Sequence, residues 1–403
     1  MTAVTITEDP MSLQALIAVA DGAQIELSDP VRIRIADARA VVDRALAAND
    51  AVYGLTTQVG HGKDTRLTEQ QLRGAQLFLI RSHAGGLGPP LGVRTVRATL
   101  AARLNGIARG GSGASLAAAD VLVALLNHGV HPQVPSTGSV GANPSILHPA
   151  VAAATGIAGH RQAADHLREL LAGSRLLESV GVRSVQDALS FRVVPQVHGA
   201  FRHYLAALEQ SVTQELNAAS DNPLASVAEQ TMISNGNFQP MVLAIAVDAL
   251  RIAVTHVGQL SERRMAHLWD AFYAQLGHEL PGPALGLPLR YPAAAVYAEL
   301  RHLAAPATLD PPTLDFGVED HASGAPLSLR LTERALDLLQ DLLAIETLLA
   351  RDVLALTADR APLGHRTGAL LADLDDAAAT GAGAAPQDIH REVRNRLARA
   401  TLE

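Results

Sequence analysis

The chain has 403 residues, of which 48% are hydrophobic, 18% charged and only 3% aromatic, and its formal net charge is -8. This apolar content excludes a disordered chain, and the acidic balance with a single lysine, Lys63, argues against nucleic-acid binding. Cysteine is absent, which excludes disulfides, thiolate metal sites and a cysteine nucleophile.

The sequence pattern indicates neither a membrane span nor a leader. Asp120 interrupts the most apolar stretch, residues 115–126, short of the roughly 18 apolar residues that cross a bilayer. The first residues, MTAVTITEDP, lack the charged-then-apolar pattern of a secretory signal. We therefore expect a cytoplasmic globular protein with no membrane contact.

Helical periodicity runs through nearly the whole chain, and strand-like alternation is confined to residues 23–35. Thr68 and Gln71 form a capping box ahead of a helix that ends at His83. Further helices are predicted, in chain order, at 94–109, 115–128, 185–217, 238–276 and 326–356. Pro195 should kink the helix that contains it.

The long helices carry apolar faces that one subunit cannot cover alone. In residues 326–356 the leucines that recur at three- and four-residue steps are Leu329, Leu336, Leu339, Leu343 and Leu349. Only residues 377–386 read as a flexible spacer. We therefore predict one continuous domain over residues 1–403, a mainly α-helical bundle that forms an oligomer.

General chemical motifs are few. Gly110-Gly111-Ser112-Gly113 follows a helix rather than a strand, so a turn is favoured over a nucleotide loop. His198 and His203 are five residues apart and off a common helical face, which favours structural roles over metal ligation. We expect no metal site and no bound cofactor.

Eight motifs, however, occur in the order typical of one enzyme family. They include a tyrosine loop (residues 53–60, YGLTTQVG), residues 82–88 (SHAGGLG) and residues 192–200 (RVVPQVHGA). The others lie at residues 103–113, 220–224, 236–238, 261–264 and 319–321. The chain resembles the histidine and phenylalanine ammonia-lyases over about residues 10–360. That resemblance implies an all-α, long-helix bundle of the ammonia-lyase (fumarase/aspartase-like) type with a small irregular N-terminal region. It also implies a homotetramer whose active sites combine several subunits.

The chain departs from this family at its electrophile. The family cyclises an Ala-Ser-Gly triad into a methylidene-imidazolone, but here Ala142 is followed by Asn143 and Pro144. Asparagine cannot dehydrate to a methylidene, and proline has no N–H with which to attack. A stretch of the family's sequence is predicted to be deleted near residues 142–145. Ala322-Ser323-Gly324 repeats the triad's letters at the start of a predicted helix, where cyclisation is not expected.

The residues that survive define a candidate site. The resemblance implies that Tyr53 is the catalytic base, with Glu319 and His83 as further proton-handling or positioning groups. Arg192 would bind a carboxylate bidentately, and Gln196, one helical turn further on, would share that face. Phe238 would form a pocket wall, while Leu189 and Gln239 stand where the family has a tyrosine and a histidine.

Three hypotheses remain open from the sequence. The first is acid–base chemistry on an activated small molecule with a carboxylate or carbonyl, as an intramolecular amine-addition cyclase or a betaine lyase. The second is a catalytically inactive binding or scaffold protein with a lyase fold. The third is an ordinary ammonia-lyase that uses Ala322-Ser323-Gly324. Lys63 is the one amine available for a Schiff base, and a solvated loop lysine is favoured.

Overall fold

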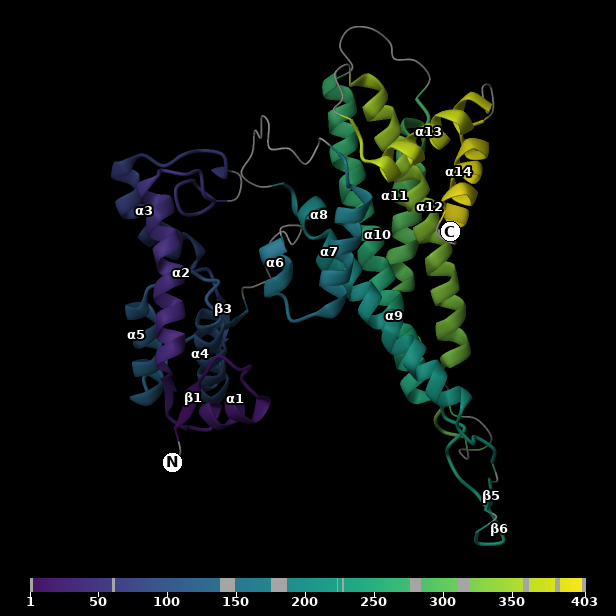
Figure 1. The fold of residues 1–403 in the computed structure, drawn as a ribbon. Coiled ribbons are helices and arrows are strands. Elements are labelled where there is room, and N and C mark those ends of the chain that lie inside the picture. The colour runs from purple at the N-terminus through teal and green to yellow at the C-terminus, as the bar shows by residue number, and fades with distance from the viewer. Residues whose placement is uncertain are drawn as a thin grey trace. The chain divides into compact units, whose positions relative to one another are not determined.

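The computed structural model describes residues 3–59, 62–137, 149–174, 187–222, 224–226, 228–275, 284–309, 313, 316, 319–357, 362–380 and 385–400. Within these residues the fold is predominantly helical (Figure 1), as the sequence predicts. The contacts separate into two compact units: unit 1 is 1–142 with 181–187, and unit 2 is 143–180 with 188–403. The prediction of one continuous domain stays a prediction.

Unit 1 combines small sheets with helices of moderate length. Its elements are β1 (Val4–Ile6), α1 (Leu13–Ala20), β2 (Ile25–Leu27), α2 (Asp29–Ala47), α3 (Glu69–His83), β3 (Leu87–Pro90), α4 (Val93–Ala108), α5 (Leu116–Asn127) and β4 (Pro135–Thr137). Strands β1 and β2 pair in parallel, and β3 and β4 pair antiparallel. The predicted alternation over residues 23–35 is wrong beyond Leu27, because Pro30 in its first turn favours the start of α2.

A buried arginine holds the core of unit 1 together. Helix α4 packs against α1, α2 and α5, and Arg97 on α4 is 6% exposed. Its guanidinium donates to the carbonyl oxygens of Val19, Ala23 and Leu126 at 2.8–3.0 Å. One side chain thus joins carbonyl groups near the ends of α1 and α5, where helix carbonyls lack continuing intrahelical partners.

Unit 2 is built from long helices. Its elements are α6 (Pro149–Ala154), α7 (Ala158–Leu170), α8 (Leu189–Arg192), α9 (Val194–Leu216), β5 (Leu224–Ser226), β6 (Thr231–Ile233), α10 (Met241–Gln275), the 3-10 helix η3 (Leu287–Leu289), α11 (Arg290–Leu303), α12 (Ala325–Leu356), α13 (His365–Thr380) and α14 (Pro386–Ala400). Helix α10 packs against α9, α11 and α12. Strands β5 and β6 form a hairpin beyond one end of the bundle (Figure 1).

The apolar pattern of the sequence locates these helices but not every buried position. Leu339 and Leu349 of the predicted stripe are buried, whereas Leu329 is 50% exposed. Helix α10 is, among the described helices, the one long and apolar enough to cross a membrane, although half of its apolar window is buried. The sequence analysis took residues 115–126 as the most apolar stretch and expected no membrane span. Helix α10 is a core helix of unit 2.

Close helix packing depends on glycine, as the small-residue composition suggests. A Cβ added to Gly159 on α7 would lie 2.3 Å from the carbonyl oxygen of Gly199 on α9. Any side chain at either position would force these two helices apart. Gly199 therefore has a packing role within the motif that contains Arg192 and Gln196.

A buried ion pair fixes the beginning of α12 against α10. Arg251, 0% exposed, donates to Asp248 at 2.6 Å and to the carbonyl and hydroxyl oxygens of Ser328, each at 3.0 Å. Burial works to raise the pKa of Asp248, but hydrogen bonds from Ser328, Thr308 and Arg251 outweigh it and lower that pKa. The network contacts Thr308 and Ser328, which lie on either side of Glu319 in the chain.

Asp352 is a testable anchor of the same bundle. Its carboxylate is 2% exposed and accepts the backbone N–H groups of Leu285, Gly286 and Leu287 at 2.7–3.0 Å. Asp352→Asn replaces one acceptor oxygen by a donor that faces these N–H groups. We expect a loss of about 2–4 kcal/mol in the free energy of unfolding, measured by urea denaturation.

Asp388→Asn is the control, because Asp388 makes an exposed ion pair with Arg391. It should change stability by less than about 0.5 kcal/mol. Equal effects of the two substitutions would contradict the anchoring role of Asp352.

Candidate active site

The tyrosine loop of unit 1 is a self-contained turn between α2 and α3. The backbone N–H groups of Leu55, Thr56 and Thr57 all donate to the carbonyl oxygen of Val52 at 3.0–3.2 Å. Thr56 is 2% exposed, and its hydroxyl accepts the N–H of Val52 at 2.8 Å. These contacts hold the loop in shape and leave Tyr53 on its surface, 37% exposed.

Two further residues of unit 1 were singled out from the sequence. His83 is the last residue of α3, which begins at Thr68 with the predicted capping box. The His83 side chain lies outside the described part of the chain. Lys63 pairs with Asp64 at 2.9 Å, and its role as a solvated loop lysine stays a prediction.

In unit 2, Pro195 separates Arg192 from Gln196 by a break in the helix. Helix α8 ends at Arg192, Val193 leaves helical geometry at ψ 12°, and α9 starts with proline in its first turn. The predicted kink is therefore an interruption at Val193, and Arg192 and Gln196 lie in two successive helices rather than in one continuous helical turn. Arg192 Nε is buried and has no hydrogen-bond partner among the described residues.

Helix α8 lies against the second half of α10. Arg264 on α10 donates to the carbonyl oxygen of Ser190 at 3.2 Å, and the rings of Phe191 and His267 are 5.7 Å apart. Arg264 also forms a two-point ion pair with Glu346 on α12, one bond of which is 2.9 Å. Because its own charge is paired, Arg264 positions α8, and Arg192 remains the candidate carboxylate ligand.

Buried polar atoms without partners among the described residues gather in this region, and the sequence prediction gave His198, one of their residues, only a structural role. Besides Arg192 Nε, they include the hydroxyls of Ser190 and Ser261 and Nε2 of His198. Burial, followed by the positive charges of Arg264 and Arg202, lowers the pKa of His198 from 6.5 to about 4. His198 is therefore neutral at physiological pH, and its sequence signal was only its place beside the arginine motif.

The remaining predicted residues lie at the other end of α10. Phe238 is 48% exposed just before α10, and Gln239 donates through Nε2 to the carbonyl oxygen of His321 at 3.2 Å. Glu319, two residues before His321, is exposed. Gln239 therefore ties the segment containing Glu319 to the start of α10, a contact the sequence did not indicate.

One subunit cannot bring these two groups together. At ~1.5 Å per residue, Met241 and Arg264 lie about 35 Å apart along the axis of α10. Figure 1 shows α8 beside the upper half of the unit 2 bundle and the β5–β6 hairpin beyond its lower end. Leu189, Arg192 and Gln196 thus belong to one end, and Phe238, Gln239 and Glu319 to the other.

The prosthetic group of the resembling family does not fit the residues present. Ala142, Asn143 and Pro144 lie outside the described residues, and their chemistry excludes cyclisation. At the second triad, Gly324 takes the left-handed conformation (φ 64°) that begins α12, and the Ser323 hydroxyl accepts the N–H of Ala325 at 3.3 Å. Ser323 and Gly324 therefore begin a helix, and no reaction step is assigned to them.

Comparisons with known proteins agree with the motifs. The family profile described as aromatic amino acid lyase matches residues 11–144 and 142–376. The histidine ammonia-lyase of Chloroflexus aurantiacus is 30% identical, covering 85% of each chain. That of Myxococcus xanthus is 29% identical, covering 92% of this chain and 91% of the relative. Their alignments span 448 and 464 residues, more than this chain contains, so they include gaps where this chain has no counterpart.

Solved structures share the fold. The ergothioneine degrading enzyme ergothionase of Treponema denticola has a TM-score of 0.57 at 23% identity, covering 98% of this chain and 99% of its own. The histidine ammonia-lyase of Trypanosoma cruzi has a TM-score of 0.52 at 24% identity, covering 99% and 94%. These similarities establish an all-α ammonia-lyase fold.

His198 gives a pH test of the region around α8. Its lowered pKa means that, between about pH 4 and 6.5, the unfolded chain binds a proton that the folded chain does not. Its contribution to stability is therefore complete above pH 6.5 and is lost as the pH falls toward 4. His198→Asn should reduce the loss of stability between pH 6.5 and 4.5 by about 2 kcal/mol, measured by urea denaturation at each pH.

His166→Asn is the matched control, because His166 is an exposed residue of α7. It should leave the pH slope unchanged. The pKa of His160 is also lowered by burial and by His203. Because His160 is present in the original chain and in both variants, we expect its contribution to the pH slope to cancel when the slopes are compared. An unchanged slope in His198→Asn would show that His198 is not held neutral.

Proposed function

Because the chain belongs to the aromatic amino acid lyase family, we propose that it forms or breaks a C–N or C–X bond without a methylidene-imidazolone. Asn143 and Pro144 carry this proposal, since they replace the residues that make the family's electrophile. Tyr53, Arg192 and Glu319 are retained. A substrate already activated for addition or elimination is therefore required. The meeting of the two profile segments at 142–144 supports a deletion at that point.

Two reactions satisfy this requirement. In a betaine lyase, the Tyr53 phenolate takes the β-proton, the C–H electron pair becomes the C=C bond, and trimethylamine leaves with the electrons of the Cα–N bond. In an amine-addition cyclase, the substrate's own amine adds to the β-carbon of an unsaturated carbonyl, and the α-carbon gains the proton that the amine loses. Neither reaction expels ammonia.

The surviving side chains have distinct roles in this scheme. Arg192 binds the substrate carboxylate, aided by Gln196, because a guanidinium offers two parallel donors. Glu319 and His83 handle or position the second proton. Phe238, Gln239 and Leu189 contact the substrate's remaining surface, and Gln239 in addition holds the segment of Glu319 through His321.

We propose that each active site is completed by several copies of the chain, in a homotetramer. The group of Arg192 and the group of Glu319 lie about 35 Å apart along the axis of α10, which supports this proposal because no small substrate spans that distance. Exposed apolar side chains also gather at the end that carries Glu319, on α9, α10 and α12. They are Val212, Leu216, Val242, Ile245, Ile252, Leu327 and Leu329, each at least 39% exposed.

The cytoplasm is the proposed location, and a small molecule the proposed substrate. Ergothioneine, a trimethylammonium betaine, is one suitable probe because a fold relative degrades it. At 23% identity that relative shows the shared fold alone. Betaines of histidine and phenylalanine are therefore included as probes of the elimination chemistry.

Tyr53→Phe tests the proposed base. Two reactions are assayed: trimethylamine release from the trimethylammonium betaines and ring closure of amino-substituted unsaturated amides. Their rates are compared with the rate of ammonia release from free histidine and phenylalanine. We expect turnover of an activated substrate only, and a loss of about 10²–10⁴-fold in kcat/KM for Tyr53→Phe. Tyr291→Phe, at a tyrosine that is 77% exposed, should keep full activity.

Three results would contradict the proposal. Undiminished turnover by Tyr53→Phe removes Tyr53 as the base. Ammonia release from histidine, with an intact mass lower by two water molecules, identifies an ordinary ammonia-lyase that uses Ala322-Ser323-Gly324. If neither activated substrate class reacts, the scaffold alternative is favoured. Leu189, in place of the family's tyrosine, supports that alternative.

A further inference from the structure

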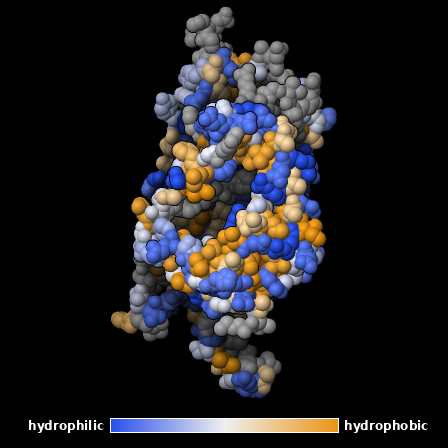
Figure 2. All heavy atoms as spheres, turned by 90° about the vertical axis from the view of Figure 1, so that its left-hand side faces the viewer, coloured by the Kyte–Doolittle hydropathy of each residue, from blue (hydrophilic) through white to orange (hydrophobic). Residues whose placement is uncertain are grey.

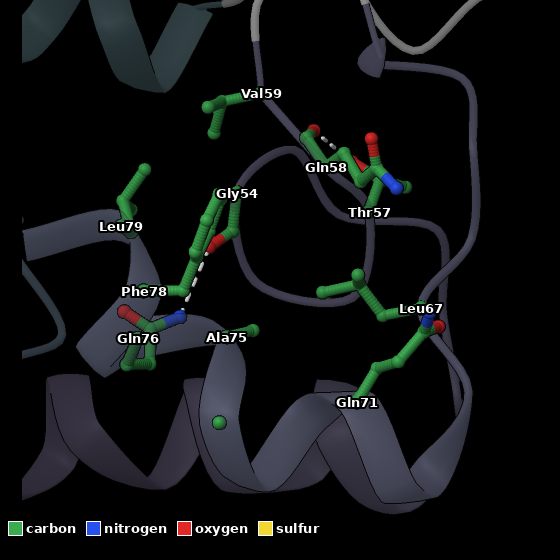
Figure 3. A pocket seen from close by; sticks show the side chains of 11 residues that line it. Gly54, Thr57, Gln58, Val59, Leu67, Gln71, Ala75, Gln76, Phe78 and Leu79 are labelled. Atoms are coloured by element: carbon green, nitrogen blue, oxygen red, sulfur yellow. Dashed lines mark hydrogen bonds between the residues drawn. The ribbon is translucent and has the colours of Figure 1, made fainter. Parts of the chain in front are cut away.

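A cavity of about 530 Å³ lies between the tyrosine loop and α3 (Figure 3), and it is lined by Gly54, the residue that follows Tyr53 in the chain. The loop contributes Gly54, Thr57, Gln58 and Val59, and Leu67 precedes α3. The lining residues from α3 are Gln71, Gly74, Ala75, Gln76, Phe78 and Leu79. This volume is within the range of pockets that bind small organic molecules.

The sequence keeps this space open by placing small residues on α3. A Cβ added to Gly74 would meet no atom within 4 Å, and Figure 3 shows the methyl group of Ala75 directed into the space. Gly54 adopts φ +68°, which lets the loop turn back over the helix. Gln76 Nε2 donates to the Gly54 carbonyl oxygen at 3.1 Å, so loop and helix are held together at one side of the cavity.

The cavity is uncharged where the structure describes its lining. None of the eleven lining residues is ionisable: the polar groups are the hydroxyl of Thr57 and three side-chain amides. Val59, Leu67, Phe78 and Leu79 supply the apolar surface. An ammonium or carboxylate that entered would lose its hydration without gaining an opposite charge from these residues.

We propose that this cavity binds an uncharged acyl or aryl group of the substrate, with a neutral amide as the preferred polar end. This inference rests on the proposed function, because it assumes that Tyr53, the residue before Gly54, acts on the same molecule. The substrate is then larger than a free amino acid. Its charged end lies outside the cavity, and its neutral part fills the space between the tyrosine loop and α3.

The surroundings of the cavity favour the same ligand class. Figure 2 shows apolar side chains gathered in patches among hydrophilic ones on one face of the molecule. In unit 1, the exposed apolar residues of α3 include Leu77, Phe78 and Ile80, at 51–72% exposure. Phe78 also lines the cavity, so the apolar surface continues from the outside of α3 into the space beside Tyr53.

The test compares three probes of equal chain length by isothermal titration calorimetry: octanamide, octanoate and octylammonium. We expect octanamide to bind at least tenfold more tightly than either charged probe. Gly74→Leu should weaken octanamide binding at least tenfold, because leucine fills the cavity. Leucine also raises helix propensity over glycine, so this variant should fold. Ala75→Leu is a second filling variant, with folding of both checked by circular dichroism.

Gly106→Leu is the matched control, since Gly106 is an exposed helical glycine on α4 whose added Cβ meets nothing within 4 Å. It should bind octanamide as the original chain does. The proposal would be overturned if the three probes bound equally or if none bound. It would also be overturned if folded Gly74→Leu or Ala75→Leu bound octanamide as tightly as the original chain. Tyr53→Phe should keep octanamide binding. A failure of Tyr53 as base is thereby distinguished from a failure of the cavity as a binding site.

Discussion

Helix α10 imposes the constraint on which the site depends. It is a continuous 35-residue helix packed against α9, α11 and α12, so it cannot fold back on itself. The carboxylate-binding candidate Arg192 lies near its second half, and Glu319 lies before α12 beside its start. Since a rigid rod keeps these groups apart in one chain, the proposed chemistry requires an assembly in which one copy supplies what another lacks.

The buried polar contacts of unit 2 maintain that geometry. Arg251 and Asp248 hold the start of α12 against α10, and Arg264 with Glu346 holds α8 and α12 at the other end. Removing one partner of such a pair leaves a buried charge uncompensated, so both contacts favour a single arrangement. The first pair contacts α12 shortly after the segment of Glu319, and Arg264 contacts the carbonyl oxygen of Ser190, two residues before Arg192.

The proposed loss of the electrophile accompanies further departures that the resemblance implies. Leu189, aligned with a family tyrosine, is 49% exposed, and the Gln239 amide donates to the His321 carbonyl oxygen. The cavity beside Tyr53 offers no described charge. Together these features favour a larger, partly neutral and already activated substrate, for which acid–base groups and an arginine are sufficient.

The sequence predicted the helices whose signals are local. Thr68 and Gln71 cap α3, and Pro195 breaks the helix at α8, because capping and the missing proline N–H act within a few residues. The family motifs located Tyr53, Arg192 and Glu319. Long-range contacts were not predictable. The lowered pKa of His198 comes from burial and then from Arg264, 66 positions later, and the Gly159–Gly199 contact joins separate helices. The cavity beside Tyr53 likewise needs the loop and α3 in their folded positions.

Cross-linking between copies tests whether two chains complete one active site, because the chain contains no cysteine to interfere. Leu189→Cys and Phe238→Cys place single thiols at side chains that are 49% and 48% exposed, one at each end of α10. The two variants are co-expressed, treated with a short bis-maleimide and analysed by denaturing electrophoresis. We expect a covalent dimer that contains one chain of each variant, confirmed by mass spectrometry. An oligomer that yields no such mixed dimer, or a chain that remains monomeric, would contradict it.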